Sequence, residues 1–223
     1  MARRRPAERD AAGRQRLLRA LWREKLHIDR EALDHSPAHV RSAFDGIWAP
    51  LDHLLDLLTP LPSGLLRLWL DGQGGHVLLA NDGSRYTPGA QTWREREFLG
   101  LTTIALVDLL DAGNALWRPL LMMLDHLLGS DSAGECPWLS DGAGVTPALA
   151  ELGARLSQSL SLGYGHEALD ADDPHGYMAA CWSLYLRDPR ALNAIDPLTE
   201  RRLRDTIMSE GWWRRTASDG PSN

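Results

Sequence analysis

Cysteine is scarce in this sequence of 223 residues, which contains only Cys136 and Cys181. Two cysteines so far apart form neither a zinc-knuckle spacing nor a dense disulfide framework, although one bridge between them stays open. Low cysteine content is typical of proteins that fold in a reducing compartment. We therefore expect a cytoplasmic protein without a structural zinc knuckle.

Long apolar runs and several common signatures are also missing. No stretch approaches the roughly 20 apolar residues that a transmembrane helix needs. The arginines at the start are not followed by the uninterrupted apolar segment of a secretory signal. A G-x-S-x-G nucleophile elbow and a G-x-x-x-x-G-K-[S/T] phosphate loop are both absent. We therefore expect no membrane span, no secretory signal, no serine-hydrolase elbow and no P-loop.

Charged residues are unevenly distributed along the chain. Residues 1–30 contain ten arginines and lysines and four acidic residues, so they carry a formal charge of +6 while the remainder carries −12. Hydrophobic residues make up 43% of the sequence, which is enough for a real core, and charged residues make up 24%, which argues against wholesale disorder. The bias towards Arg, Ala, Leu, Gly and Asp is typical of a GC-rich bacterial genome.

An amphipathic helix is predicted over residues 15–26, where apolar residues recur at helical spacing opposite a face of arginines. Such a helix either binds a partner, a membrane surface or a nucleic acid, or packs on its own domain behind a basic tail. We favour packing because acidic residues interleave with the arginines. If the helix binds a partner instead, the candidate contact residues are Arg16, Arg19, Trp22 and Arg23. Nucleic-acid binding through residues 1–30 is disfavoured because the rest of the chain is acidic and no recognition motif is present.

Hydrophobic periodicity and turn residues predict the remaining elements. We expect a helix over residues 37–58 with a kink or break at Pro50, a hairpin of strands at residues 65–71 and 76–82, and an extended segment at residues 91–94. A loop is expected from residue 129 to residue 144. Further helices are expected at residues 98–110, 117–128, 147–160, 176–187 and 197–213.

This pattern predicts an α+β fold that is mainly helical, with a small mixed or antiparallel sheet. We expect residues 1–60 to form a basic helical extension, residues 61–213 the main domain and residues 214–223 a disordered tail. The pair Trp212 and Trp213, followed by two arginines, either anchors a partner or a lipid surface or docks a C-terminal helix.

Three segments resemble motifs of one protein family. The stretch LLMMLDHLLG at residues 120–129 is similar to a zinc helix of the form LLHELGHLLG, and RYTPGAQTW at residues 85–93 is similar to the edge strand that precedes it. The stretch HGYMAACWSLYLRDPRALNAIDP at residues 175–197 is similar to the downstream glutamate helix, and it is the most specific of the three. The chain thus resembles the lethal-factor-like zincin metallopeptidases over about half its length, and the resemblance implies a zincin-like fold.

The departures from this family fall at the positions of the metal chemistry. In a zincin, two histidines one turn apart and a third ligand from a later helix bind Zn²⁺, while a glutamate activates the attacking water. By the resemblance, Met122 and Met123 stand at the first histidine and this glutamate, Gly176 and Ala180 stand at glutamates of the downstream helix, and only His126 matches. A lone imidazole does not hold zinc, and a thioether or a methyl group does not take a proton. We therefore expect a pseudo-metallopeptidase that acts as a binding or regulatory module without a cofactor.

A non-standard metal site is the alternative. The segment GYGHEALDADDPH at residues 163–175 contains His166, Asp170 and His175, which together with His126 could supply ligands for zinc in a metal-dependent hydrolase. Glycines and a proline in this segment favour a solvated acidic loop instead. In the preferred interpretation His126 borders a leucine core and is hydrogen-bonded to Asp125 or to a loop carbonyl, and the two methionines fill that core.

A protein or peptide partner is expected in the groove that corresponds to the substrate groove of these peptidases. The resemblance places this groove between the extended segment at residues 91–94, which includes Trp93, and the helix at residues 117–128. Cys181 is expected to be a buried, inert thiol because it lies within an apolar helix.

Overall fold

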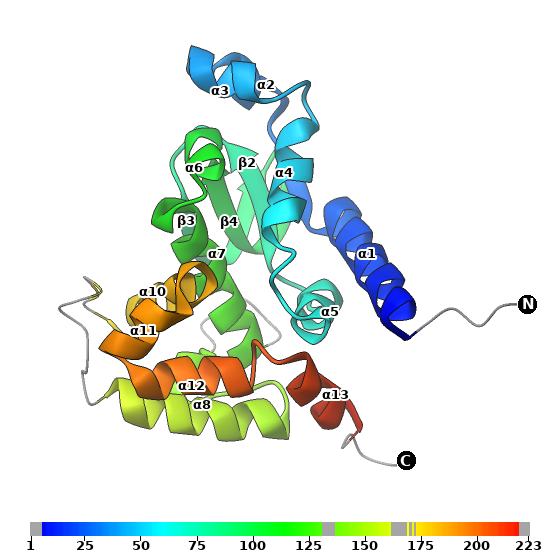
Figure 1. Cartoon of the computed structure of the whole chain (residues 1–223). Coiled ribbons are helices and arrows are strands. Elements are labelled where there is room, and N and C mark those ends of the chain that lie inside the picture. The colour runs from blue at the N-terminus through cyan, green and yellow to red at the C-terminus, as the bar shows by residue number, and fades with distance from the viewer. Residues whose placement is uncertain (1–5, 131–136, 162–168, 170, 172, 219–223) are drawn as a thin grey trace, which may run out of the picture.

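The computed structural model describes residues 6–130, 137–161, 169, 171 and 173–218. These residues form an α+β fold in which many helices surround one small sheet of four strands (Figure 1). The predicted fold class, mainly helical with a small mixed sheet, is confirmed. Among the described residues, no helix combines the length and the apolar character that crossing a bilayer requires.

The sheet contains strands in the order β1-β2-β4-β3. β1 (Leu26–Ile28) and β4 (Arg96–Ala105) flank β2 (His76–Ala80) in parallel, and β3 (Arg85–Trp93) pairs with β4 as an antiparallel hairpin at the edge. Alternate residues of a strand point to opposite faces. One face therefore joins the main core through Val77, Leu79 and Ile104, and the other forms a small cluster of Leu78, Ala80, Phe98 and Leu101.

Five helices precede the hairpin: α1 (Pro6–Glu24), α2 (Arg30–Asp34), α3 (Ala38–Ala43), α4 (Ala49–Leu57) and α5 (Ser63–Asp71). Leu21, Leu54 and Trp69 of this region are fully buried in the same core as the strands. Lys25 is buried between α1 and β1, and its Nζ donates hydrogen bonds to the carbonyl oxygens of Gly72, at 2.5 Å, and Gly74, at 2.9 Å. The domain boundary at residue 60 stays a prediction.

The second half of the chain is organised around α7 (Asn114–Gly129), which runs from the sheet into the lower layer of helices (Figure 1). It follows α6 (Leu106–Asp111) and packs against β3, β4 and α10. The remaining elements are the 3-10 turn η1 (Leu139–Asp141), α8 (Pro147–Leu160), α10 (Pro174–Arg187), α11 (Pro189–Ile195), α12 (Pro197–Asp205) and α13 (Glu210–Ser218). Residues 214–218 of the predicted tail belong to α13, and residues 219–223 lie outside the described residues.

Asp-Pro pairs begin three of these helices. Asp173, Asp188 and Asp196 each precede a proline at the first helical position, and each carboxylate accepts hydrogen bonds from free backbone N–H groups of the first turn. Proline has no N–H to leave unpaired there, and aspartate is among the best N-cap residues. The sequence thus fixes where α10, α11 and α12 start.

The predicted strand at residues 65–71 is wrong, because these residues form α5. Leu65, Leu66 and Trp69 are fully buried, and their spacing places them on one face of a helix. The apolar and polar residues of LLRLWLD also alternate, which is why the sequence suggested a strand. The Trp69 indole Nε1–H donates to the Gly75 carbonyl oxygen at 2.6 Å and joins the end of α5 to the following loop. The strand at residue 76 is correct, but it pairs in parallel with β1 and β4 and forms no hairpin with residues 65–71.

The predicted helix at residues 98–110 is also wrong, because β4 continues to Ala105 before the short α6 begins. β4 is buried on both faces, so it lacks the alternation that marks a half-exposed strand. Two long predicted helices are each divided in two: residues 37–58 form α3 and α4, and residues 197–213 contain α12 and the start of α13. The helix breaks between α3 and α4, just before Pro50, which lies in the first turn of α4, where proline is tolerated.

The β3–β4 hairpin closes through a two-residue turn at Arg94 and Glu95. Both residues have positive φ, 48° and 64°, a region that favours glycine and asparagine. The Arg94 guanidinium also contacts the Asp29 carboxylate at 2.6 Å and so ties the hairpin to the end of β1. The turn therefore combines local backbone strain with a long-range ion pair.

Gly129 allows the chain at residues 137–139 to cross the end of α7. A Cβ at this position would lie 2.3 Å from the Trp138 carbonyl carbon and 2.4 Å from the Leu139 nitrogen. We expect Gly129→Ala to lower the free energy of unfolding by about 1–3 kcal/mol because backbone must move. Gly13→Ala is the matched control: its Cβ meets nothing within 4 Å, and alanine in a helix interior should add about 0.5–1 kcal/mol. Urea unfolding of both variants measures this difference, and equal stabilities would contradict it.

Candidate functional site

His126 lies on the buried side of α7 and contacts the edge strand. Its side chain is 1% exposed, and a hydrogen bond of 2.7 Å joins its Nδ1 to the Tyr86 Oη on β3. The two rings meet edge to face at 5.9 Å. Burial raises the pKa of Tyr86 well above its ordinary range, so this phenol stays protonated at neutral pH. The predicted environment of His126, a leucine core with a hydrogen bond, is confirmed, and the Tyr86 hydroxyl is a partner of its Nδ1 that was not predicted.

The Trp138 indole lies between two imidazoles. It stacks on His126 with ring centroids 4.7 Å apart and planes 5° from parallel, and on His175 at 4.1 Å and 12°. Tyr86 meets the same indole edge to face at 5.7 Å. Three segments far apart in the sequence, on β3, α7 and α10, therefore converge on one tryptophan.

Two aspartates hold the Trp138 segment in place. The buried Asp125 carboxylate accepts hydrogen bonds from the Ser140 N–H at 3.0 Å and the Ser140 hydroxyl at 2.5 Å. Asp141 accepts from the Trp138 N–H at 3.0 Å, and its other oxygen lies 2.8 Å from Nε2 of His175. Neighbouring residues on α7 thus act together, since His126 stacks on the indole while Asp125 anchors the turn that carries it.

The other positions assigned by resemblance carry no ligand chemistry. Met123 is fully buried in the core and Met122 is packed against it, as predicted for core filler. Gly176 is buried and lies next to Arg118 of α7. A Cβ at position 176 would lie 2.7 Å from Arg118 Nη2. Ala180 is partly buried on α10.

The alternative metal ligands are only partly described. His166 and Asp170 lie outside the described residues. His175 is described, and it contacts Trp138, Asp141 and, at 3.9 Å, Asp173. Within the described ranges, no group of three or more His, Cys, Asp or Glu side chains is placed to hold a metal ion.

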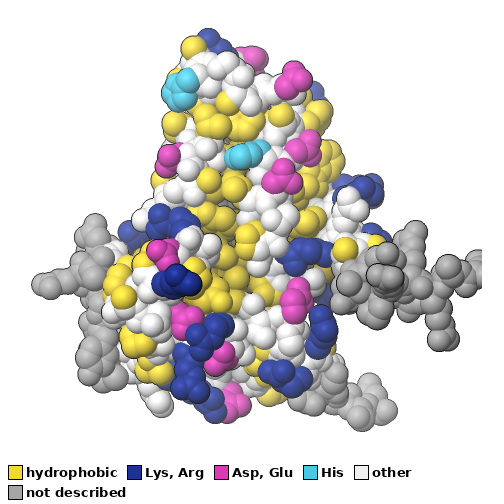
Figure 2. Space-filling model, viewed as in Figure 1, with side chains coloured by type: hydrophobic (Ala, Val, Ile, Leu, Met, Phe, Trp, Pro, Cys, Tyr) yellow, Lys and Arg dark blue, Asp and Glu magenta, His cyan; other side chains and the backbone are white. Residues whose placement is uncertain are grey.

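The predicted partner residues lie in two separate places. Arg16, Arg19 and Arg23 are exposed on α1, and Trp22 is partly buried, with its indole 5.8 Å from that of Trp48. Trp93 packs on Phe98, on the face of the sheet that carries the small cluster of Leu78, Ala80, Phe98 and Leu101. Over α12, in the lower part of Figure 2, arginines and acids alternate and form no patch of one sign. Nucleic-acid binding through residues 1–30, the disfavoured alternative, stays untested.

Sequence reasoning missed a second pair of imidazoles. His27 on β1 and His76 on β2 lie side by side, with Nε2 and Nδ1 3.1 Å apart, and both pack on Phe98 at 4.9 Å. Burial, followed by nearby positive charges, lowers the pKa of each to about 4, so both are neutral at pH 7. The parallel pairing of β1 with β2 that brings them together has no local sequence signal. Cys181 is buried and free, and burial raises its pKa to about 12, as expected for an inert thiol.

Comparisons with protein-family models, with curated proteins and with solved structures gave no match. The chemistry of the His126–Trp138–His175 stack must therefore be inferred from its own atoms. The stack offers aromatic faces, and two of its ring nitrogens are engaged: His126 Nδ1 with the Tyr86 hydroxyl and His175 Nε2 with the Asp141 carboxylate.

Asp125 makes this region sensitive to pH. Burial raises its pKa from 3.8 to about 7, while the hydrogen bonds from Ser140 oppose the rise. A raised carboxyl pKa means that ionisation disfavours the folded state, so the Asp125 contribution to stability is greatest below about pH 4 and is lost as the pH rises to about 7. Relative to the neutral Asp125→Asn variant, we expect the wild-type free energy of unfolding to fall by about 4 kcal/mol over this window and to stay constant above it.

Urea unfolding of both proteins between pH 4 and pH 8 measures this change. The exposed Asp52→Asn variant controls for the loss of one negative charge. A difference between wild type and Asp125→Asn that does not vary with pH would show that the buried carboxyl does not titrate in this range.

Proposed function

We propose that this protein is a binding module on a zincin-like scaffold that has lost its metal site, and that it binds an extended peptide along the outer edge of β3. The observation that carries the proposal is the Trp138 indole stacked between His126 and His175. Aromatic packing stands there at the position where the resemblance expects a metal centre.

The order and packing of the elements support a zincin-like scaffold. The resemblance expects an edge strand, then a metal helix, then a downstream helix that brings the third ligand. In this chain β3 is an antiparallel edge strand, α7 follows it, and α10 packs against α7. β3 and α7 contain the first two segments on which the resemblance rests, and the third segment begins in α10 and continues through α11 to the start of α12.

The donor atoms do not fit zinc. A catalytic zinc needs about three protein ligands and a position for water. The Nδ1 of His126 is engaged with Tyr86, and the Trp138 indole covers its ring. At the other ligand positions, residues 122 and 123 are methionines with thioether side chains, residue 176 is a glycine without a side chain, and residue 180 is an alanine with a methyl group. No hydrolytic step can be derived from this set.

The edge of β3 supports peptide binding. β3 is nine residues long, and in the described part of the chain no strand pairs with its outer edge. Pro88 and Gly89 lie at a bulge in its pairing with β4. An unpaired edge presents a row of backbone N–H and C=O groups that an extended peptide can match, with side-chain contacts giving specificity.

The metal half of the proposal is tested by elemental analysis of untagged protein after mild exchange against zinc. We expect far less than one zinc per chain and no change in melting temperature with a chelator. One zinc per chain that is lost in His126→Ala would overturn this half and revive the hydrolase alternative.

The binding half is tested by selecting peptides from a random-sequence library on the wild-type protein. Lysines on an edge strand discourage strand addition, so the double variant Ala90→Lys, Thr92→Lys should bind the selected peptides at least about tenfold more weakly. Both positions are exposed, and the exposed pair Asn193→Lys, Ala194→Lys on α11 is the matched control. Equal binding by the wild type and the β3 variant would exclude this edge.

A further inference from the structure

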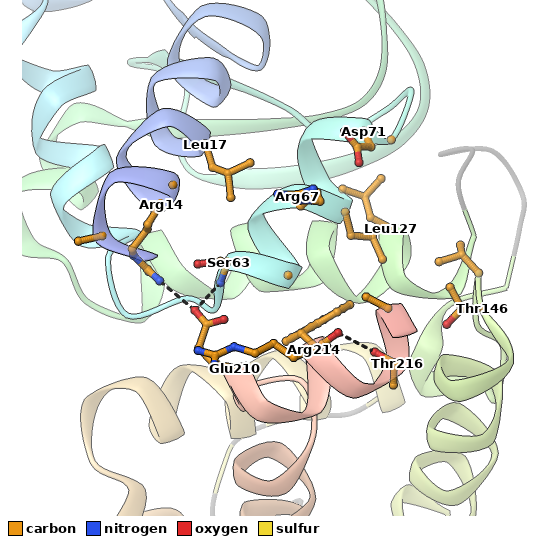
Figure 3. Close-up of a pocket in the computed structure, with 18 residues that line it drawn as sticks. Arg14, Leu17, Ser63, Arg67, Asp71, Leu127, Thr146, Glu210, Arg214 and Thr216 are labelled. Atoms are coloured by element: carbon orange, nitrogen blue, oxygen red, sulfur yellow. Dashed lines mark hydrogen bonds and ion pairs between the residues drawn. The ribbon is translucent and has the colours of Figure 1, made fainter. Parts of the chain in front are cut away.

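A pocket of about 840 Å³ lies between the first and last described helices. α5 forms its floor, and α1 and α13 form its walls (Figure 3). Leu127 from the end of α7 and Val145, just before α8, complete the lining. Volumes of about 300–1,000 Å³ are typical of sites for small molecules.

The lining is mainly apolar. It includes Leu17 on α1, Leu68 on α5, Leu127 on α7 and Trp213 on α13. Gly13 on α1 also lines the pocket, and a Cβ at this position would meet no atom within 4 Å. Such a lining favours a hydrocarbon chain over a polar solute.

One end of the pocket is closed by a polar junction of three helices. The Glu210 carboxylate accepts a hydrogen bond from the Ser63 N–H at 2.7 Å and pairs with the Arg14 guanidinium at 3.4 Å. Arg14 also donates to the carbonyl oxygens of Thr59 and Leu61. Figure 3 shows this junction spanning from α1 to α13 across the start of α5.

The charge that remains uncompensated at the pocket is positive. The lining contains three arginines, Arg14, Arg67 and Arg214, and two acidic residues, Asp71 and Glu210. Glu210 is paired with Arg14. Arg67, one turn after Ser63 on α5, is exposed and makes no hydrogen bond or ion pair with any described residue. A guanidinium in this position suits a carboxylate, which it binds through two parallel hydrogen bonds.

We propose that this pocket binds a long-chain monocarboxylate, with its carboxylate on Arg67 and its hydrocarbon chain along Leu68, Leu127 and Trp213. The apolar lining supplies the affinity and the guanidinium orients the chain. This site shares no residue with the stack or the β3 edge, so it is independent of the proposed peptide binding.

Dodecanoate is the probe, used below its micellar concentration and followed by isothermal titration calorimetry on the full chain. We expect saturable binding at one site per chain, about tenfold weaker binding for Arg67→Glu, and similarly weakened binding of dodecanol to the wild type. Gly13→Phe should abolish binding because its ring fills the pocket. Arg190→Glu on α11 gives the same charge change on an exposed surface outside the pocket and should leave binding unchanged.

Circular dichroism melting of each variant separates loss of binding from loss of folding. Three results would overturn the proposal: no saturable binding of dodecanoate, unchanged binding by Gly13→Phe, or equal binding of the acid and the alcohol with no effect of Arg67→Glu. The last result would show an apolar pocket without carboxylate recognition.

Discussion

The burial of α7 is the constraint on which the rest of the structure depends. This helix contacts the sheet on one side and α5, α8 and α10 on others, and most of its residues from Leu116 to Gly129 are buried. A helix buried around its circumference must satisfy every polar side chain internally. Asp125 and His126 are the polar residues in its buried half, and each has a dedicated partner, Ser140 and Tyr86.

The segment around Trp138 follows from this requirement. Asp125 needs donors, and the η1 turn supplies two from Ser140. The same turn then places Trp138 over His126, and Gly129 makes room for the backbone to pass. Aromatic stacking and hydrogen bonds thus accommodate the polar side chains of α7 within the core.

The sequence predicts the helices that carry strong local signals. α8 matches its predicted range because Thr146-Pro147 begins it, and α10 starts close to its prediction because Asp173-Pro174 does the same. α5 and β4 were predicted wrongly, since burial on several sides removes the periodicity that separates a helix from a strand. His126 could be singled out from its motif, but Trp138 and Ser140 could not, because their contacts join residues 12 to 52 positions apart through tertiary packing rather than through any local pattern.

The turn at Arg94 and Glu95 gives the β3 edge a dependence on ionic strength. Two non-glycine residues with positive φ cost of the order of 1 kcal/mol each. The ion pair of Arg94 with Asp29 opposes this local preference, and both side chains are partly exposed, at 48% and 30%. Salt screens such a pair, with a Debye length of about 8 Å at physiological ionic strength and about 3 Å at 1 M. The hairpin tip is therefore held most firmly in dilute buffer, whereas the helical core, which is held by apolar contacts, does not share this response to salt.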